Sequence, residues 1–197
     1  EVRIADPDTG APLPPGTEGE IRLRGPNVMR GIIGRNRADV FDADGFYPTA
    51  DRGVLDADGY LWYRGRLDDM FKVRGATVYP MEVEAALRAL PDVSDAYVTD
   101  VPAATGGEAA EDGEAGGAGG RGAREVAAVV VTGVDDPDEL AGQVRTRLSS
   151  FKVPTRWVLL RDPHRVPRLA SGKVDINALR RLVREEGVAS SRKAGPA

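Results

Sequence analysis

Up to residue 66, apolar and polar positions alternate in short stretches separated by turn residues. Val2-Arg-Ile-Ala and Glu20-Ile-Arg-Leu-Arg24 fit strands with one buried face. Residues 42–45 and 56–59 share the sequence Asp-Ala-Asp-Gly, which is typical of hairpin turns. The same sequence resembles the start of a calcium loop, but the downstream bidentate glutamate of an EF-hand is absent. We therefore expect an antiparallel, β-rich segment joined by tight turns.

Beyond residue 70 the apolar spacing changes, and it predicts an α+β domain. Val83, Leu87 and Leu90 recur along one helical face after Pro80, which suits the first turn of a helix. A β-hairpin bent at Arg74-Gly75 precedes this helix, and apolar, β-branched runs predict a three-stranded sheet after it. The expected strands are 70–73, 76–79, 96–101, 125–132 and 157–160, and the expected helices are 81–90, 136–148 and 177–186.

Residues 103–124 are largely Gly, Ala and Glu, a composition that cannot bury a core. We interpret this stretch as a flexible insertion in a hairpin loop rather than as a linker between domains. The tail, 188–197, is expected to be disordered.

Composition excludes several classes of function. The net charge of −4 argues against a nucleic-acid partner, which would usually require a basic patch. No apolar run approaches the roughly 20 residues that a membrane-spanning helix needs. There is no cysteine, and His164 is the single histidine, which disfavours disulfides, thiolate chemistry and histidine-based metal sites. We expect a cytoplasmic protein without a metal site of its own, and Glu1 in place of Met indicates that the native start is missing.

Three motifs occur in a fixed order along the chain. They are Tyr47-Pro-Thr-Ala-Asp51, the stretch RGRLDDMFKVRGATVYPMEVE that runs from Arg64 to Glu84, and Pro167-Arg-Leu-Ala-Ser-Gly-Lys-Val-Asp175. Together they resemble the signature of the adenylate-forming superfamily, which includes acyl-CoA synthetases, peptide-synthetase adenylation domains and luciferases. The resemblance covers nearly the whole chain, but only about the last third of such an enzyme.

The resemblance implies a nucleotide-binding role for two residues. Asp51, expected on a loop between two hairpins, would accept hydrogen bonds from both ribose hydroxyls of ATP, a task for an acceptor-only group. Arg66 would reach the ribose and phosphate region, although a surface ion pair with Asp68 or Asp69 is the alternative. The family usually has Gly before the aspartate. Ala50 stands there instead, at a cost of roughly 1 kcal/mol if positive φ is required.

Asp68 matches the family's hinge, about which the small C-terminal domain rotates. This divides the chain into 1–67, a β-barrel-like end of the large domain, and 68–187, a mobile lid. Lys173, in the loop before the last helix, would contact the substrate carboxylate and the α-phosphate during adenylation. In the second orientation Lys72, Arg74 and Gly75 would face the active site, where Gly75 admits the pantetheine arm close to the backbone.

The sequence therefore predicts the C-terminal part of an ATP-dependent acyl-CoA synthetase that forms acyl-AMP from a carboxylic acid and transfers the acyl group to CoA. The implied cofactors are ATP, Mg²⁺ and CoA. One alternative is an adenylation domain or ligase that loads the phosphopantetheine of a carrier protein, although Gly-Ala-Thr-Val-Tyr-Pro-x-Glu-Val-Glu resembles CoA ligases more closely. Another alternative is a non-catalytic, stand-alone lid that binds or regulates a partner. The phosphate loop, adenine site and acid pocket are expected before Glu1.

Overall fold

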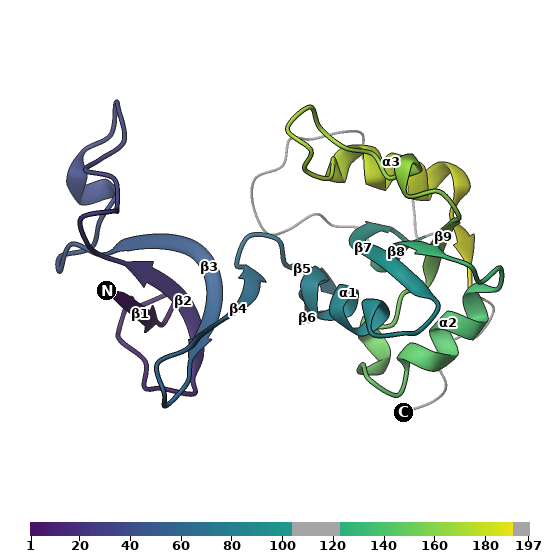
Figure 1. Cartoon of the computed structure of the whole chain (residues 1–197), viewed down its shortest axis with the longest axis horizontal. Helices are drawn as coiled ribbons and strands as arrows, with labels where there is room; N and C mark the ends of the chain where they lie inside the picture. The colour runs from purple at the N-terminus through teal and green to yellow at the C-terminus, as the bar shows by residue number, and fades with distance from the viewer. Residues whose placement is uncertain (104–122, 191–197) are drawn as a thin grey trace. The chain divides into compact units, whose positions relative to one another are not determined.

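The computed structural model describes residues 1–103 and 123–190, which fall into two compact units (Figure 1). The first unit is Glu1–Met70 and the second is Phe71–Ala197. Each unit has its own sheet, as the change in apolar spacing near residue 70 suggests.

The first unit is an open antiparallel sheet whose strands are neighbours in chain order. The strands are β1 (Val2–Ala5), β2 (Glu18–Leu23), β3 (Tyr47–Leu55) and β4 (Leu61–Arg66), and a 3₁₀ turn, η1 (Arg37–Asp39), lies between β2 and β3. Both Asp-Ala-Asp-Gly stretches are turns, as predicted. Asp56 Oδ1 accepts backbone N–H bonds from Asp58 and Tyr60, and Asp42 Oδ1 accepts the equivalent pair. These aspartates organise their own turns.

The second unit begins with a two-stranded hairpin and continues as a four-stranded sheet in the order β10-β9-β8-β7. Its strands are β5 (Phe71–Val73), β6 (Ala76–Val78), β7 (Val93–Pro102), β8 (Arg124–Thr132), β9 (Arg156–Leu160) and β10 (Val188–Ala189). Its helices are α1 (Pro80–Arg88), α2 (Pro137–Val144) and α3 (Ile176–Glu186), with 3₁₀ turns η2 (Ser150–Lys152) and η3 (Pro163–Arg165).

The C-terminal sheet has one strand more than predicted. Val188 and Ala189 pair antiparallel with Trp157 and Arg156 of β9, so the expectation that disorder starts at residue 188 is wrong. Residues 191–197 lie outside the described residues. Most of the insertion predicted at 103–124 also lies outside them. Its two ends meet where Pro102 pairs with Arg124.

Helices cover both faces of this sheet. β8 is buried along Val126–Thr132 without interruption, which explains its continuous apolar sequence. Residues of α1 and α2 pack on one face around the fully buried Trp157, and residues of α3 pack on the other face. Figure 1 shows α3 on the opposite side of the sheet from α1 and α2. The loop that carries Lys173 leads directly into α3, so the fold places it on that side.

α2 is shorter than the predicted helix 136–148. Asp136 caps its start by accepting the Asp138 N–H at 2.9 Å. At the other end, the Thr146 hydroxyl donates to the Gln143 carbonyl at 2.9 Å and so takes an acceptor that a longer helix would use. None of the helices in the described part of the chain is long and apolar enough to cross a membrane.

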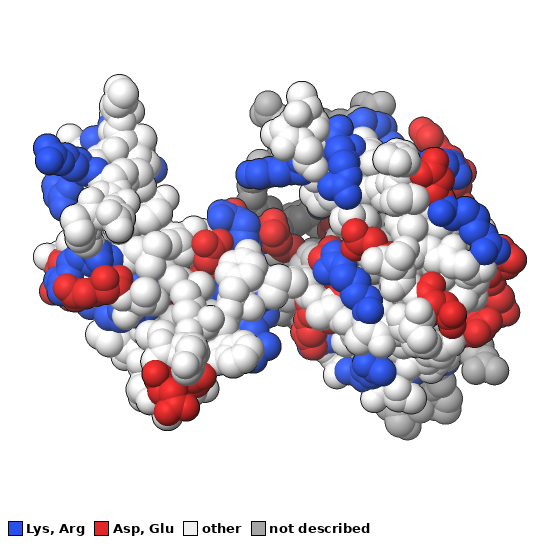
Figure 2. All heavy atoms as spheres, in the orientation of Figure 1, with Lys and Arg blue, Asp and Glu red and all other residues white. Residues whose placement is uncertain are grey.

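Charge is distributed in both signs over the second unit. Figure 2 shows cationic and anionic side chains next to one another on its visible face. Several form ion pairs between elements. Asp100 on β7 is nearly buried and lies between Arg124 of β8 and Arg180 of α3, whose Nη2 is 2.8 Å away. Burial alone would raise the pKa of Asp100, but the two arginines outweigh it and lower the pKa. This carboxylate anchors α3 to the sheet.

Candidate functional site

The hairpin predicted around Arg74-Gly75 is present, with two residues in its turn. β5 and β6 pair from Phe71↔Val78 to Val73↔Ala76. Arg74 has φ +50° and Gly75 has φ +84°, the pair of positive angles that a type I′ turn requires. Glycine adopts this conformation without strain, whereas arginine does not.

The hairpin presents one lysine and an open turn. Lys72 Nζ is hydrogen-bonded to the hydroxyl of its cross-strand partner, Thr77. A β-carbon built on Gly75 would meet no described atom within 4 Å, so the backbone there is open to approach. The role in thiol approach that the resemblance implies for Gly75 stays a prediction.

Asp51 does not lie on a loop, and that expectation is wrong. It belongs to β3 and pairs with Arg66 of β4. Residues 49–51 of β3 face the single residue Ile21 of β2, because the register runs from Arg22↔Pro48 to Glu20↔Arg52. Thr49 stabilises this bulge, since its hydroxyl donates to Ile21 O at 2.8 Å and accepts Asp51 N–H at 3.0 Å. A bulge of this kind redirects a side chain out of the strand pattern.

Ala50 has φ +59°, the left-handed conformation that glycine favours. Both of its backbone polar groups are held. Its N–H donates to Glu20 Oε1 at 3.2 Å, and its carbonyl accepts Leu67 N–H at 2.8 Å. Glu20 is buried and is fixed in turn by Arg22 Nε at 3.0 Å. The surrounding contacts therefore impose the strained conformation on Ala50.

Replacing Ala50 by glycine should stabilise the chain. Glycine removes the strain of the left-handed conformation, which is about 1–2 kcal/mol. Its greater conformational freedom in the unfolded chain destabilises the folded state by about 0.4–1 kcal/mol and so offsets part of this gain. We expect Ala50→Gly to raise the free energy of unfolding by about 0.5–1 kcal/mol, measured by denaturant titration. Ala50→Val is the matched variant and should lower it, because a β-branched residue tolerates positive φ least. A less stable glycine variant would show that the left-handed conformation is not native.

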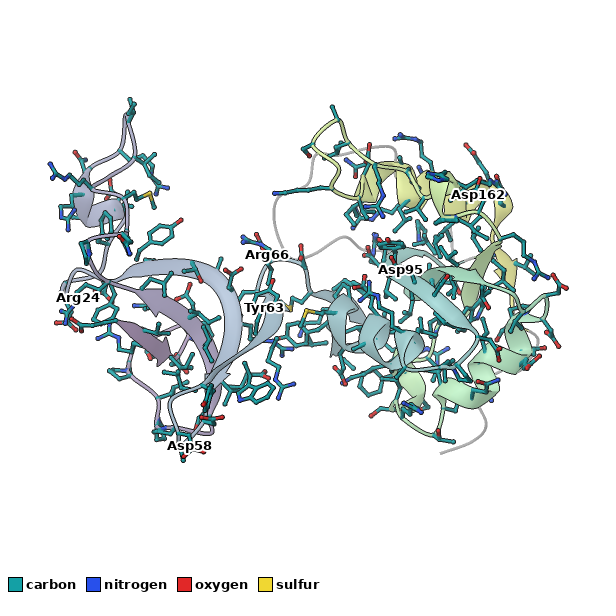
Figure 3. The ribbon with its side chains drawn as sticks, viewed as in Figure 1. Arg24, Asp58, Tyr63, Arg66, Asp95 and Asp162 are labelled. Atoms are coloured by element: carbon teal, nitrogen blue, oxygen red, sulfur yellow. The ribbon has the colours of Figure 1, made fainter. Side chains whose placement is uncertain are left out.

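Arg66 joins two carboxylates. Its Nε and Nη2 bind the two oxygens of Asp68 at 2.8 and 2.9 Å, and its Nη1 lies 3.2 Å from Asp51 Oδ1. Figure 3 labels Arg66 beside Tyr63, which is also on β4. The hydrogen bonds from Arg66 lower the pKa of Asp68, and the same contacts raise the pKa of Arg66. The ion pair with Asp68 that was the alternative for Arg66 is therefore present, and Arg66 also contacts Asp51. Its role at the ribose and phosphate stays a prediction.

Asp51 has the chemistry to bind a sugar. Its side chain is 33% exposed, and among the described residues no group hydrogen-bonds to its second oxygen, Oδ2. An ionised carboxylate is acceptor-only and suits two neighbouring hydroxyl donors. Burial and the charge of Asp68 raise the pKa of the neighbouring acid, Asp69.

The Lys173 loop is a tight, glycine-containing turn. Arg168 and Val174 form an isolated antiparallel bridge, Leu169 N–H donates to Lys173 O, and Gly172 N–H donates to Leu169 O, both at 2.8 Å. Gly172 takes φ +83°, which explains glycine at this position. Asp175 caps α3 immediately afterwards by accepting Ala178 N–H at 2.9 Å.

Lys173 differs from the other described lysines. Lys72 is bonded to Thr77, and Lys152 Nζ lies 2.6 Å and 2.7 Å from the two oxygens of Glu82. Lys173 is exposed, and within residues 1–103 and 123–190 its ammonium has no hydrogen-bond partner. An unpaired ammonium on an ordered loop is free to bind an anionic oxygen.

No metal site is formed by the described residues. No group of three or more His, Cys, Asp or Glu side chains in that part of the chain could hold a metal ion. Its single histidine, His164, is exposed on η3.

Comparisons with known proteins place this chain. A scan against protein-family profiles finds no match. Feruloyl-CoA synthase from an Amycolatopsis species is 38% identical over 186 residues, which are 92% of this chain and 34% of that protein. Among solved structures, ATP-bound MatB from Rhodopseudomonas palustris has a TM-score of 0.71 and 32% identity, and the match covers 92% of this chain and 33% of MatB. The chain belongs to the adenylate-forming superfamily.

A second structure shows where in an adenylate-forming enzyme the chain fits. The o-succinylbenzoate CoA synthetase MenE from Bacillus subtilis, in complex with its acyl-adenylate intermediate, has a TM-score of 0.67 at 29% identity. That match covers all of this chain and 35% of MenE. The chain corresponds to the C-terminal portion of adenylate-forming enzymes and spans about a third of the length of these relatives. The recognition made from the three motifs and the α+β fold are both confirmed.

Sequence reasoning missed part of the site of this superfamily member. Glu20 supports Ala50 from another strand, and Arg168 contacts the Lys173 loop from inside the third motif. The alternation along this strand predicts that Glu20 and Arg22 lie on its exposed face, so no sequence signal marked their burial. Arg168 could have been found as the second cation of a motif in which only Lys173 was given a role.

Proposed function

We propose that this chain is the C-terminal part of an ATP-dependent, AMP-forming acid:thiol ligase that makes an acyl-CoA from a carboxylic acid. The observation that carries the proposal is the 38% identity to feruloyl-CoA synthase over 92% of the chain. The arrangement of Asp51 with Arg66 and the free ammonium of Lys173 support it, because they supply an acceptor for hydroxyl groups and a cation for an anionic oxygen.

The proposed reaction has two steps. A carboxylate oxygen of the acid attacks the α-phosphorus of ATP, the bond to the bridging oxygen breaks, and pyrophosphate leaves. The thiol of CoA then loses its proton to solvent and its sulfur attacks the acyl carbonyl; the bond between the carbonyl carbon and the phosphate oxygen of AMP breaks, and AMP leaves. Lys173 would stabilise the negative charge that develops on the phosphoryl oxygens in the first step. Mg²⁺ would neutralise phosphate charge and arrive bound to ATP rather than to residues of this chain.

We propose that the two steps use different residues of the chain, as the resemblance to the family implies. Asp51 would hold the ribose in both steps, and the turn at Arg74-Gly75 would admit the thiol in the second step, with Lys72 nearby. We favour CoA over a carrier protein as the acceptor because feruloyl-CoA synthase, 2-succinylbenzoate–CoA ligase and o-succinylbenzoate CoA synthetase are relatives of this chain. The cytoplasmic setting remains a prediction.

The complete protein should exchange labelled pyrophosphate into ATP only when an acid substrate is present, and should release AMP and a thioester once CoA is added. Ferulate and o-succinylbenzoate are the first acids to test, since relatives are named for them. Release of ADP instead of AMP, or no acid-dependent exchange across a broad panel, would contradict the proposal. If a thioester formed on the phosphopantetheine of a carrier protein but not on CoA, the acceptor would be the carrier protein instead of CoA.

A further inference from the structure

An arginine ties the Lys173 loop to the edge of the sheet. Arg168 Nη1 donates to the Gly172 carbonyl across the loop at 3.0 Å, and Nη2 donates to the Tyr97 hydroxyl on β7 at 2.8 Å. The guanidinium also lies 5.8 Å from the centre of the Tyr97 ring. One planar group therefore holds both the loop and the strand, a geometry that the compact ammonium of lysine cannot reproduce.

The Tyr97 hydroxyl links Arg168 to a carboxylate. It accepts from Arg168 and donates to Asp95 Oδ2 at 2.5 Å. A phenol can do both only while it keeps its proton. Burial, together with the hydrogen bond to Asp95, raises the pKa of Tyr97, so the phenol stays neutral at physiological pH. Asp95 is labelled in Figure 3 at the edge of the sheet.

From Asp95 the connection reaches α1. Arg88 Nε donates to Asp95 Oδ1 at 2.8 Å, and Arg88 Nη2 donates to the Ala96 carbonyl at 2.5 Å. Arg88 also contacts Glu84, whose Oε1 accepts the Val98 N–H at 3.0 Å. Among the described strands β7 is at the end of the sheet, so these side chains occupy backbone groups on its outer edge.

The connection therefore runs around the edge of the sheet. α1 lies on one face, and the Lys173 loop leads into α3 on the other. Positive and negative groups alternate from Arg168 through Asp95 and Arg88 to Glu84. Arg88 and Asp95 are more than a third exposed, and exposed ion pairs contribute little to stability. A contribution to folding stability alone therefore explains poorly why five side chains are linked in this way.

We propose that Arg168 and Tyr97 are positioning residues that hold the Lys173 loop in the geometry needed for adenylation. The proposal rests on the function proposed above, in which Lys173 contacts the reacting phosphate. The Gly172 carbonyl bound by Arg168 belongs to the peptide that joins Gly172 to Lys173, so fixing it fixes the start of the lysine side chain. Small displacements of a catalytic group reduce rates strongly.

The first test measures the loop itself. In the complete protein, Tyr97→Phe removes one hydroxyl and leaves the ring. We expect amide hydrogens of residues 168–175 to exchange severalfold faster than in the wild type. Arg165→Gln is the control. Arg165 is an exposed arginine three residues before Arg168, and it pairs with Glu186 at 2.7 Å instead of contacting the loop. That variant should leave exchange in 168–175 unchanged. Equal exchange in Tyr97→Phe and the wild type would overturn the proposal.

The second test separates positioning from folding. Tyr97→Phe and Arg168→Gln should slow acid-dependent pyrophosphate exchange about tenfold to a hundredfold, mainly through kcat. Both should leave thioester formation from synthetic acyl-AMP and the unfolding temperature near wild type. Arg168→Lys keeps the charge but cannot span both partners, so it should behave like Arg168→Gln.

The outcomes of this test distinguish the two proposals. If the wild type exchanges pyrophosphate and Tyr97→Phe is equally active, the positioning role is wrong and the proposed function stands. If the wild type shows no exchange, the proposed function fails and the adenylation role of the loop fails with it. Full rescue by Arg168→Lys would also overturn the positioning role, since charge alone would then suffice.

Discussion

Replacing Lys173 by alanine in the complete protein should abolish formation of acyl-AMP while sparing the thioester step that starts from synthetic acyl-AMP. The ammonium of Lys173 has no partner in the described part of the chain and sits on an ordered turn, so it is available where phosphoryl charge develops. Preorganised electrostatic contacts of this type contribute about 3–4 kcal/mol, or about 10²–10³ in rate. Acid-dependent pyrophosphate exchange measures the first step, and single-turnover thiolysis measures the second.

A second lysine provides the control for this prediction. Lys152→Ala makes the same chemical change at an ammonium that is paired with Glu82, and it should leave both steps near wild-type rates. Pyrophosphate exchange that survives in Lys173→Ala at near wild-type rate would remove Lys173 from the mechanism. Equal losses in the two lysine variants would indicate a general effect of charge.

Fixing the backbone at Asp68 should slow thioester formation and spare adenylation, the reverse of the effect expected for Lys173→Ala. Asp68 lies in the turn between β4 and β5, next to the division between the two units. Proline would hold φ near −65° and remove an N–H, which should trap one orientation if this residue is the proposed hinge. We expect Asp68→Pro to keep adenylation largely intact and to slow thioester formation about a hundredfold or more, measured by single-turnover kinetics of each step.

This prediction needs a control because Asp68 is also paired with Arg66. Asp68→Pro removes a carboxylate that binds Arg66 through both oxygens, and Arg66 in turn contacts Asp51. Asp68→Ala removes the same carboxylate without restricting φ, so it isolates the side-chain effect. It should affect both steps by no more than a few-fold. Similar losses of both steps in the proline and alanine variants would mean that the ion pair, and not rotation of the backbone, is what matters.

Local patterns predicted the second unit well because most of its elements carry their own signals. The positive φ angles at Arg74 and Gly75 follow from a two-residue hairpin turn, and the uninterrupted apolar run in β8 follows from burial on both faces. β10 carried no such signal. Its two residues, Val188–Ala189, become a strand only because β9, more than thirty residues earlier, offers a free edge.

The motifs name candidate residues for the site, but they do not reveal how those residues are connected in the fold. Asp51, Arg66 and Lys173 were found from motifs, yet the bulge that places Asp51 in β3 depends on contacts with β2. The sequence offered Asp68 or Asp69 as partners for Arg66, and only the pairing of β3 with β4 adds Asp51. The link from Arg168 to Tyr97 joins residues 71 positions apart, which no local pattern could reveal.

The side chains of α1 that cover the outer edge of β7 also bear on how this unit behaves in a crowded solution. An exposed strand edge is a template on which another chain can add a strand, and such pairing is the first step toward edge-to-edge aggregation of sheets. Here the Ala96 carbonyl and the Val98 N–H are already bonded to Arg88 and Glu84, so an incoming strand would have to displace both side chains. At Ala96 and Val98 the edge of β7 is therefore protected against pairing with a neighbouring molecule.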